Sequence, residues 1–176
     1  MREMQHIKVV PYDSTWPKKF QQEAQKVSDI VQTNQIAIIH IGSTSVPNLS
    51  AKPIIDILLI VNDIALLDQQ QTQFEQLGYE YLGEFGLPGR RYLRKGGDNR
   101  THQIHAYQYD NISEIQRHIC FRNYLRKHRD VALQYGELKT KLASKYPESI
   151  DDYGDGKESF VKKYEALALK EHWQNQ

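Results

Sequence analysis

Two short runs of aliphatic, mostly β-branched residues constrain the fold of this chain most. Residues 36–41 (IAIIHI) end at Gly42, and residues 54–61 (IIDILLIV) follow a turn that contains Ser, Thr, Asn and Pro. Apolar runs of this length, bounded by turn residues, are typical of strands that are buried on both faces of a sheet. Both runs are therefore predicted to be central strands, with a turn or short helix between them.

The remaining patterns add helices and an antiparallel meander. Apolar residues recur at helical spacing from Trp16 to Val31, and alternating residues between Tyr79 and Tyr109 are broken by two glycine-rich turns, which predicts three antiparallel strands. The other predicted elements are a strand at 7–11, helices at 64–77, 113–128, 131–146 and around 160–167, and a loop at 151–156. Together they predict an α+β fold, a mixed β-sheet flanked by helices. No repeat or linker divides the chain, so residues 1–176 are expected to form a single domain.

Charge and composition exclude several classes of protein. The 23 Lys and Arg residues nearly balance 22 Asp and Glu residues, and a net charge of +1 argues against a protein that coats nucleic acid. The single cysteine, Cys120, excludes an intramolecular disulfide scaffold. No stretch approaches the roughly 20 apolar residues that span a bilayer, and no signal-peptide pattern follows the N-terminus. We therefore expect a cytoplasmic protein without a membrane partner.

The turn after the first run carries candidate ligand-binding groups. Gly42 lets the backbone approach a phosphate closely, and the hydroxyl groups of Ser43 and Thr44 and nearby amides can then donate to its oxygens. The alternative is a tight turn in which glycine is needed only for its backbone geometry. The turn alone does not decide between the two.

Asp56 interrupts the second apolar run. An unpaired carboxylate between Ile55 and Ile57 would be costly to bury, so it should bind a cation, accept several hydrogen bonds or open into a cleft. A bound cation or an open cleft would indicate a functional site, whereas a carboxylate that only accepts several hydrogen bonds would have a structural role.

These residues also carry a resemblance to known proteins. Gly42-Ser43 followed by Asp56 on the next strand resembles the signature of the nucleotidyltransferase superfamily, and the string GSTSVPNLSAKPIIDI resembles the GrpB family. The resemblance extends from Val9 to Leu169 through VPYDSTWPKKF, GLPGRRYLRKG, RTHQIHAY, FRNYLRKHRDVALQYGELK and a late GK..F. It implies a nucleotidyltransferase-like fold and a nucleotide or another phosphorylated small molecule as ligand. Because some relatives are fused to dephospho-CoA kinase, it also implies association with an enzyme of coenzyme A metabolism.

The resemblance further implies divalent metals, and here the sequence departs from the pattern. The superfamily uses two acidic residues separated by one residue, with a third on a neighbouring strand, to hold two metals. Asp56 fits the first position, but Leu58 occupies the second. His102 and His105 are the candidate replacement ligands, which would suit a single metal ion. Strand alternation places them on opposite faces and favours His105, with Asp56, as the catalytic residue, although a hydrogen-bonded structural histidine is an equal alternative.

Basic residues gather in the meander. Arg90, Arg91, Arg94, Lys95 and Arg100 lie within eleven residues, and alternation places Arg90 and Arg94 on one face and Arg91 and Lys95 on the other. The predicted phosphate-binding set is Gly42, Ser43, Thr44, Lys52, Arg90, Arg91 and Lys95. A solvated charged hairpin is the alternative.

Two functions follow from these observations. The first is metal-dependent transfer of a nucleotidyl group to an unknown acceptor, with Asp56 and His105 as catalytic residues and Asp56, His102 and His105 as metal ligands. The second is a noncatalytic ligand-binding or enzyme-docking module with a degenerate nucleotidyltransferase fold, for which Leu58 is the main support. RNA binding through the basic segments is a third hypothesis, which predicts strongly salt-dependent affinity.

Overall fold

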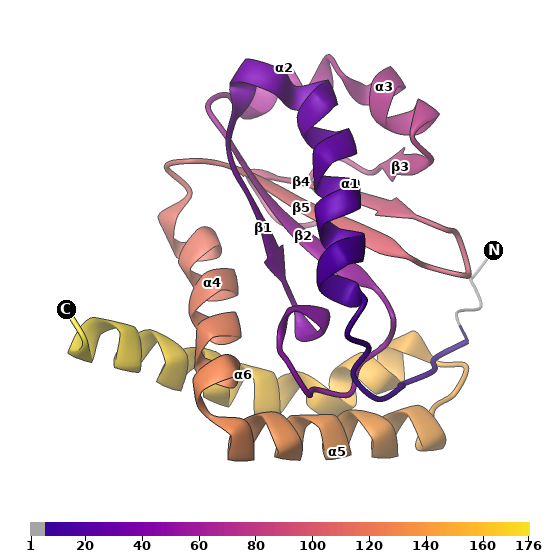
Figure 1. The fold of residues 1–176 in the computed structure, drawn as a ribbon, viewed down its shortest axis with the longest axis vertical. Helices are drawn as coiled ribbons and strands as arrows, with labels where there is room; N and C mark the ends of the chain where they lie inside the picture. The colour runs from indigo at the N-terminus through magenta and orange to yellow at the C-terminus, as the bar shows by residue number, and fades with distance from the viewer. Residues whose placement is uncertain (1–5) are drawn as a thin grey trace.

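A five-stranded mixed sheet forms the centre of the protein, seen in a computed structural model that describes residues 6–176. Residues 1–5 of the predicted domain lie outside the described residues. The strands are β1 (Gln35–Ile41), β2 (Ile55–Val61), β3 (Tyr79–Tyr81), β4 (Arg90–Lys95) and β5 (His102–Gln108). Their order is β1-β2-β5-β4-β3, in which β2 and β5 are parallel and the other pairs are antiparallel (Figure 1). The predicted α+β fold with a mixed sheet and an antiparallel meander is confirmed.

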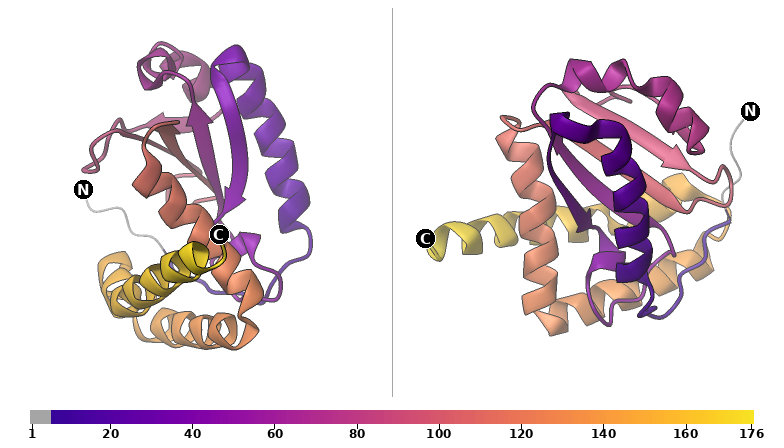
Figure 2. Two further views of the ribbon diagram at one scale, coloured as in Figure 1. Left: turned by 90° about the vertical axis from the view of Figure 1, so that its left-hand side faces the viewer. Right: turned by 45° about the horizontal axis from the view of Figure 1, so that its top comes forward.

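Helices surround the sheet on both faces and at one end. The α-helices are α1 (Trp16–Val31), α2 (Ile64–Asp68), α3 (Gln71–Gln76), α4 (Ile112–Lys127), α5 (Arg129–Lys145) and α6 (Ile150–Gln174), and two 3₁₀ turns are η1 (Gln32–Asn34) and η2 (Ser43–Ser45). Helices α1 to α3 cover one face, α4 covers part of the other, and α5 and α6 lie at the end of the sheet where η2 is found (Figures 1 and 2). We call the first face the α1 face and the second the α4 face.

The two faces have separate hydrophobic cores. On the α1 face the buried side chains of Ile57, Leu59 and Leu93 pack with Trp16 and Phe74. On the α4 face a smaller cluster joins Ile41, Leu58, Ile60 and Tyr107, against which Ile115 and Ile119 of α4 pack. The α4 cluster covers mainly β1, β2 and the end of β5, so polar residues of β2, β5 and β4 can occupy the rest of that face.

The structure corrects three expectations and refines a fourth. β1 is an edge strand, with Ile36 49% exposed, because only β2 pairs with it. Residues 7–11 form no strand and contribute one bridge, Val10 to Ala51. The helical segment predicted at 64–77 is two short helices, and the interruption at residues 69–70 falls in the polar turn expected between Asp68 and Gln71. Residues 151–156 are helical, because Ser149 caps α6 and two acidic residues in the first turn favour a helix N-terminus.

Candidate functional site

The Gly42-Ser43 turn lies in close contact with Asp56. Gly42 has a φ of +73°, which side chains rarely tolerate, and a Cβ placed on it would overlap Asp56 Oδ2 and lie 2.9 Å from Asp56 Cβ. Strand pairing sets this contact, since Ile41 of β1 is opposite Asp56 of β2. Glycine is therefore required here both for the backbone conformation and for the approach of the carboxylate.

A buried hydrogen-bond chain holds this turn in place. His40 Nε2 donates to Thr44 Oγ1 at 2.9 Å, and Thr44 Oγ1 donates to the carbonyl oxygen of Ile54 at 3.1 Å. Burial lowers the pKa of His40 to about 4, so the ring is neutral near pH 7. Ser45 Oγ also donates to the carbonyl oxygen of Gly42. His40 is thus a structural histidine, and the Thr44 hydroxyl is committed to the turn.

Asp56 and His105 meet on the α4 face. His105 Nε2 lies 3.5 Å from Asp56 Oδ1, and both side chains are partly exposed. Gln103 of β5 is opposite Asp56, and His105 is opposite Leu58. The predicted alternation is confirmed, because His102 lies on the α1 face beside Glu23 Oε2. The structure therefore brings His105, and not His102, to Asp56.

Three lysines converge on the other side of Asp56. A cavity of about 110 Å³ is bounded by Lys52, Lys139, Lys157 and Tyr153 together with Ser43, Thr44, Ala51, Ile54, Asp56 and Gln103. We call it the lysine pocket. Lys139 is only 2% exposed, and in the described part of the chain its Nζ has no hydrogen-bond partner. The hydroxyl of Tyr153, buried in the same wall, has none either.

The pKa values of these lysines reflect their crowding. Burial lowers the pKa of Lys139 far below its usual range, and the charges of Lys157 and Lys52 lower it further, whereas Asp56 opposes the shift. Burial and the charge of Lys157 lower the pKa of Lys52 to about 8, and burial lowers that of Lys157. The pocket is thus a buried concentration of cationic groups for which Asp56 supplies the opposing negative charge.

Sequence reasoning missed Lys139 and Lys157. Lys139 lies four residues after Tyr135 and three before Leu142, within the apolar stripe that predicted α5. Lys157, which is partly exposed, is likewise four residues after the buried Tyr153 on α6. An ionisable residue on an apolar stripe is the signal that could have identified both, because lysine is almost never buried without a partner.

A second cavity of about 270 Å³ adjoins the lysine pocket. The two share Ser43, Asp56, Gln103 and Lys157, and the second is also lined by Ile41, Gly42, His105, Arg117, His118, Phe121, Tyr135, Val161 and Glu165. We call it the α4 cavity. In the described residues, the buried Nδ1 atom of His105 has no hydrogen-bond partner. The α4 cavity combines aromatic walls with polar side chains.

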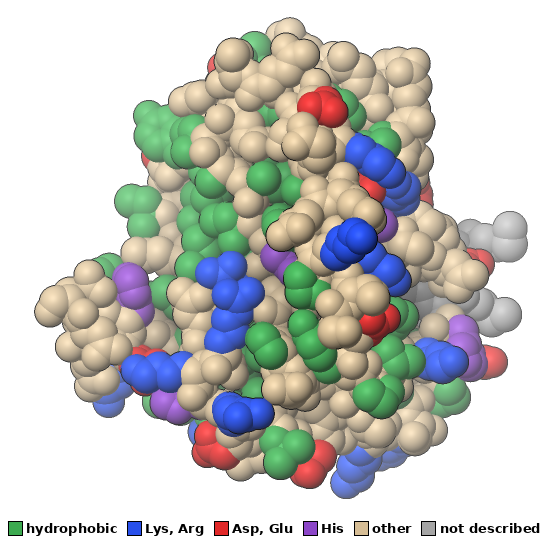
Figure 3. Space-filling model, in the orientation of Figure 1, with side chains coloured by type: hydrophobic (Ala, Val, Ile, Leu, Met, Phe, Trp, Pro, Cys, Tyr) green, Lys and Arg blue, Asp and Glu red, His purple; other side chains and the backbone are tan. Residues whose placement is uncertain are grey.

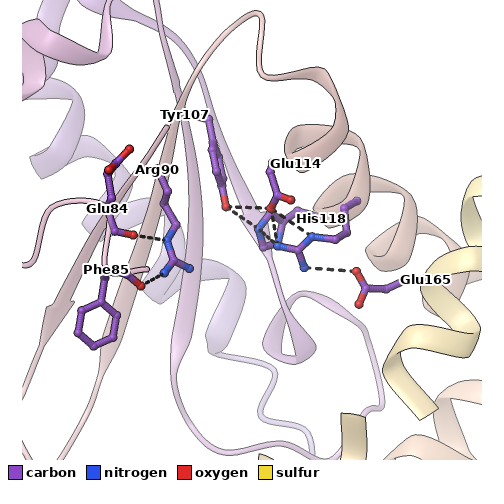
Figure 4. Close-up of polar contacts among 8 residues, drawn as sticks. Glu84, Phe85, Arg90, Tyr107, Glu114, His118 and Glu165 are labelled. Atoms are coloured by element: carbon purple, nitrogen blue, oxygen red, sulfur yellow. Dashed lines mark hydrogen bonds and ion pairs between the residues drawn. The ribbon is translucent and has the colours of Figure 1, made fainter. Parts of the chain in front are cut away.

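Charged side chains from α4 and α6 form one wall of this cavity. Arg117 donates to Glu114 Oε2 at 2.7 Å and to Glu165 Oε2 at 3.3 Å, and His118 Nε2 lies 3.3 Å from the Tyr107 hydroxyl (Figure 4). Burial, together with the charges of His105 and Arg117, lowers the pKa of His118 to about 2, so this ring stays neutral. The wall is therefore preorganised before any ligand binds.

The predicted basic residues of β4 are divided between the faces. Arg91 pairs with Asp68 of α2 at 2.7 Å, and Lys95 pairs with Glu23 of α1 at 3.0 Å, both on the α1 face. Arg90 lies on the α4 face with its guanidinium over the Tyr92 ring. The structure does not bring Arg91, Lys95 or His102 together with Asp56, so their predicted roles in binding stay predictions.

The donor set does not fit a two-metal site. Leu58, at the position of the second acidic residue, is fully buried in the α4-face cluster. Within residues 6–176, no three His, Cys, Asp or Glu side chains gather into a group that could hold a metal ion. Asp56 and His105 are the two predicted metal ligands that the structure places near each other.

The mixed five-stranded sheet with helices on both faces and at one end defines a class of α+β protein. Within it, this chain belongs to the GrpB protein family, whose sequence model matches residues 6–166. The UPF0157 protein YqkA of Bacillus subtilis is 42% identical over 164 residues, which are 93% of this chain and 48% of that protein. The chain thus spans about half the length of this relative.

One solved structure agrees with the family assignment. The crystal structure of the conserved protein GrpB from Enterococcus faecalis is 54% identical, with a TM-score of 0.92 over 94% of this chain and 99% of that one. Terminal uridylyl transferase 4 from Trypanosoma brucei is 16% identical, with a TM-score of 0.45 over 90% of this chain and 56% of that one. The second similarity is too weak to support a conclusion about activity. No helix among the described residues combines the length and apolarity needed to cross a bilayer.

Proposed function

We propose that the lysine pocket binds the phosphate groups of a nucleotide or another phosphorylated small molecule. The observation that carries this proposal is Lys139, an almost fully buried lysine whose Nζ has no hydrogen-bond partner in the described chain. Lys52 and Lys157 line the same cavity, and Ser43 adds a hydroxyl group at its edge. Two or more linked phosphates would supply the acceptor oxygens that these groups lack.

Electrostatics favours a multiply charged anion. Burying an ammonium group is costly, and three such groups around one cavity also repel each other. Asp56 offsets part of this repulsion, as its effect on the pKa of each lysine indicates. A bound diphosphate or triphosphate would neutralise the rest and draw protons onto lysines that are partly deprotonated. The protein would therefore be preorganised for the anion at the expense of its own stability.

The same arrangement suits nucleotidyl transfer. An acceptor hydroxyl group would attack the phosphorus next to the nucleoside, the bond from that phosphorus to pyrophosphate would break, and pyrophosphate would leave into the lysine pocket. The acceptor proton would pass to His105 Nε2, which Asp56 Oδ1 faces at 3.5 Å. The lysines supply positive charge on the leaving-group side, where the superfamily pattern uses metal ions. Asp56 and His105 could serve as two ligands of a single divalent ion, and no step above depends on it.

Leu58 favours the noncatalytic alternative. Its fully buried side chain supplies no ligand where the superfamily pattern has a carboxylate. A protein that binds nucleotide without turning it over would keep the lysine pocket and lose the metals. The association with a coenzyme A pathway enzyme belongs to this alternative, and dephospho-CoA is therefore included among the nucleotides to be tested.

The decisive experiment is calorimetric titration with pyrophosphate in the presence of a chelator. We expect the native protein to bind, and Lys139→Met to lose at least tenfold in affinity while melting at a higher temperature, because methionine removes a buried amino group that contacts the Tyr135 ring at 4.4 Å but has no hydrogen-bond partner among the described residues. Lys141→Met, which changes an exposed lysine of the same helix, is the matched control and should leave both properties unchanged. Equal binding by Lys139→Met, or binding that the chelator abolishes, would contradict the proposal.

Turnover separates the two forms of the function. Nucleoside triphosphates would be incubated with a panel of hydroxyl acceptors, and pyrophosphate release would be measured, whereas dephospho-CoA, which has no pyrophosphate to release, would be tested for binding by calorimetry. Release that is abolished in both Asp56→Asn and His105→Gln supports transfer. Tight binding without release from any acceptor supports the noncatalytic module.

A further inference from the structure

A row of aromatic rings runs across the α4 face from the protein surface to the site. Phe85 stacks on Tyr92 with ring centroids 5.3 Å apart and an interplanar angle of 22°. Tyr92 lies 5.5 Å from His105, and His105 lies 5.1 Å from His118. The row therefore begins at a side chain that is 56% exposed and ends in the wall of the α4 cavity.

The loop that carries Phe85 is held firmly in one conformation. Phe85 has a φ of +49°, which is unusual for a bulky residue. Arg90 donates from Nε to the carbonyl oxygen of Glu84 and from Nη2 to that of Phe85 (Figure 4). Gly89 N donates to the Glu84 carboxylate. Leu87 anchors the loop in the α4-face cluster. This backbone strain is maintained by specific contacts, and its result is an aromatic ring presented to solvent.

Two arginines flank the rings of this row, and Arg94 also pairs with Glu80 Oε1 at 3.4 Å. The guanidinium carbon of Arg90 lies 5.1 Å from the Tyr92 ring centroid, and that of Arg94 lies 5.8 Å from the Phe85 ring centroid. Guanidinium groups beside exposed aromatic rings favour planar, electron-rich ligands and their phosphates. The view from the side of α1 shows Lys and Arg side chains interspersed with hydrophobic and other polar groups (Figure 3).

We infer that Phe85 and Tyr92, with Arg90 and Arg94, form a stacking site for the heteroaromatic base of a second, small-molecule substrate. His105 lies between this site and the α4 cavity, in ring contact with both Tyr92 and His118. An acceptor stacked on Phe85 would therefore reach the Asp56–His105 pair from the side opposite the lysine pocket. The role as acceptor rests on the proposed function, whereas the stacking site itself does not.

The occupant is a single nucleoside or nucleotide rather than a polynucleotide. Only one ring of the row, that of Phe85, is substantially exposed, which is enough area for one base. Proteins that hold single strands present several stacking rings along a basic groove. The net charge of +1 also gives little general attraction for a polyanion.

Tryptophan fluorescence of Phe85→Trp tests the inference. The variant is made with Trp173→Phe, so that Trp16, which is 1% exposed, is the one remaining native tryptophan. Pyrophosphate is added first, and then nucleoside monophosphates or ribose 5-phosphate. We expect nucleoside monophosphates to quench the emission of the introduced tryptophan and ribose 5-phosphate, which lacks a base, to leave it unchanged. Equal effects of the two ligands, or no quenching, would overturn the stacking site.

Further variants separate this site from the lysine pocket. In calorimetry, Phe85→Ala should weaken nucleotide binding to pyrophosphate-saturated protein about tenfold. Tyr109→Ala, which removes an equally exposed aromatic ring elsewhere, should not. Adding Lys139→Met to the fluorescent variant should abolish pyrophosphate binding and retain quenching. If quenching were lost as well, the separate site would be refuted.

If native protein failed to bind pyrophosphate but quenching persisted, only the proposed function would fail. Quenching by oligouridylate at far lower concentrations than by uridine monophosphate would overturn the small-molecule assignment.

Discussion

The two sides of the sheet differ in whether their buried polar groups have hydrogen-bond partners. On the α1 face, Glu23 accepts hydrogen bonds from Tyr79 at 2.9 Å and Lys95 at 3.0 Å, and His102 Nε2 lies 3.7 Å from it. On the α4 face and at the adjoining end of the sheet, His105 Nδ1 and Lys139 Nζ have no hydrogen-bond partner among the described residues. A buried charge with its partners present contributes to folding, whereas one without them is costly to folding.

This difference separates structural from functional polar residues in a way that residue type alone cannot. Each face carries histidine, lysine and a carboxylate, and the sequence offered candidates from both. Burial alone would raise the pKa of Glu23, but Lys95, His102 and Tyr79 hold it below its usual value, so the carboxylate is ionised and paired. The lysines around Asp56 have their pKa values lowered instead. The α1 face is therefore complete as a protein structure, whereas the cationic groups around Asp56 are the ones that the proposed anion would neutralise.

The largest expected effect comes from breaking the α1-face network. Glu23→Ala would leave Lys95 and the Tyr79 hydroxyl without their carboxylate partner, and we expect it to lower the free energy of unfolding by about 3 kcal/mol. Urea denaturation followed by circular dichroism measures this change. Pyrophosphate affinity should be unaffected in the folded variant. A loss below about 0.5 kcal/mol, which is usual for a surface substitution, would show that the network is not structural.

A smaller effect, an increase in the free energy of unfolding, is expected when the pH is raised and Lys139 in the lysine pocket loses its proton. The unfolded chain keeps a proton on Lys139 up to about pH 10.5, whereas the folded protein releases it at lower pH. In that interval the folded state binds fewer protons, so stability due to Lys139 rises with pH, by at most about 1.4 kcal/mol per pH unit. We expect native protein to gain stability between pH 7 and pH 9.

Lys139→Met is the comparison that isolates this contribution. Its stability at pH 7 should exceed that of native protein, and its gain between pH 7 and pH 9 should be smaller. Chemical denaturation at both pH values measures the difference. Pyrophosphate should also bind native protein less tightly at pH 9, because the deprotonated lysines no longer attract it. Identical pH profiles for the two proteins would mean that Lys139 is charged in the folded state.

Local sequence patterns predicted the helices and strands better than they predicted the long-range contacts between them. Helical spacing located α1, and strand alternation placed His105 beside Asp56 and His102 away from it. The apolar composition of β1 did not reveal that it is an edge strand, because strand order depends on which segments pair and not on the segment alone. Lys139 and Lys157 are more than 80 residues beyond Asp56 in the chain. Their approach to it results from the packing of α5 and α6 at the end of the sheet, which no local pattern encodes.

The smallest expected effect concerns Arg91, which alternation correctly placed on the face away from Arg90. Its guanidinium binds Asp68 through Nε at 2.7 Å and Nη2 at 3.1 Å, and the Tyr81 hydroxyl donates to the same carboxylate. Because Asp68 is exposed, solvent screens this pair, and Arg91→Ala should lower the free energy of unfolding by less than about 1 kcal/mol.

Arg91→Ala also tests the division of β4 between the two faces. Pyrophosphate affinity in calorimetry should equal that of native protein, since a charge that is paired on the α1 face contributes little to an anion on the α4 face. Arg90→Ala, one residue earlier on the same strand, removes the contacts that hold the Phe85 loop and should weaken nucleotide binding to pyrophosphate-saturated protein. Should Arg91→Ala reduce pyrophosphate affinity as much as Lys139→Met does, anion binding would have to extend across the sheet, and the contrast between the faces would fail.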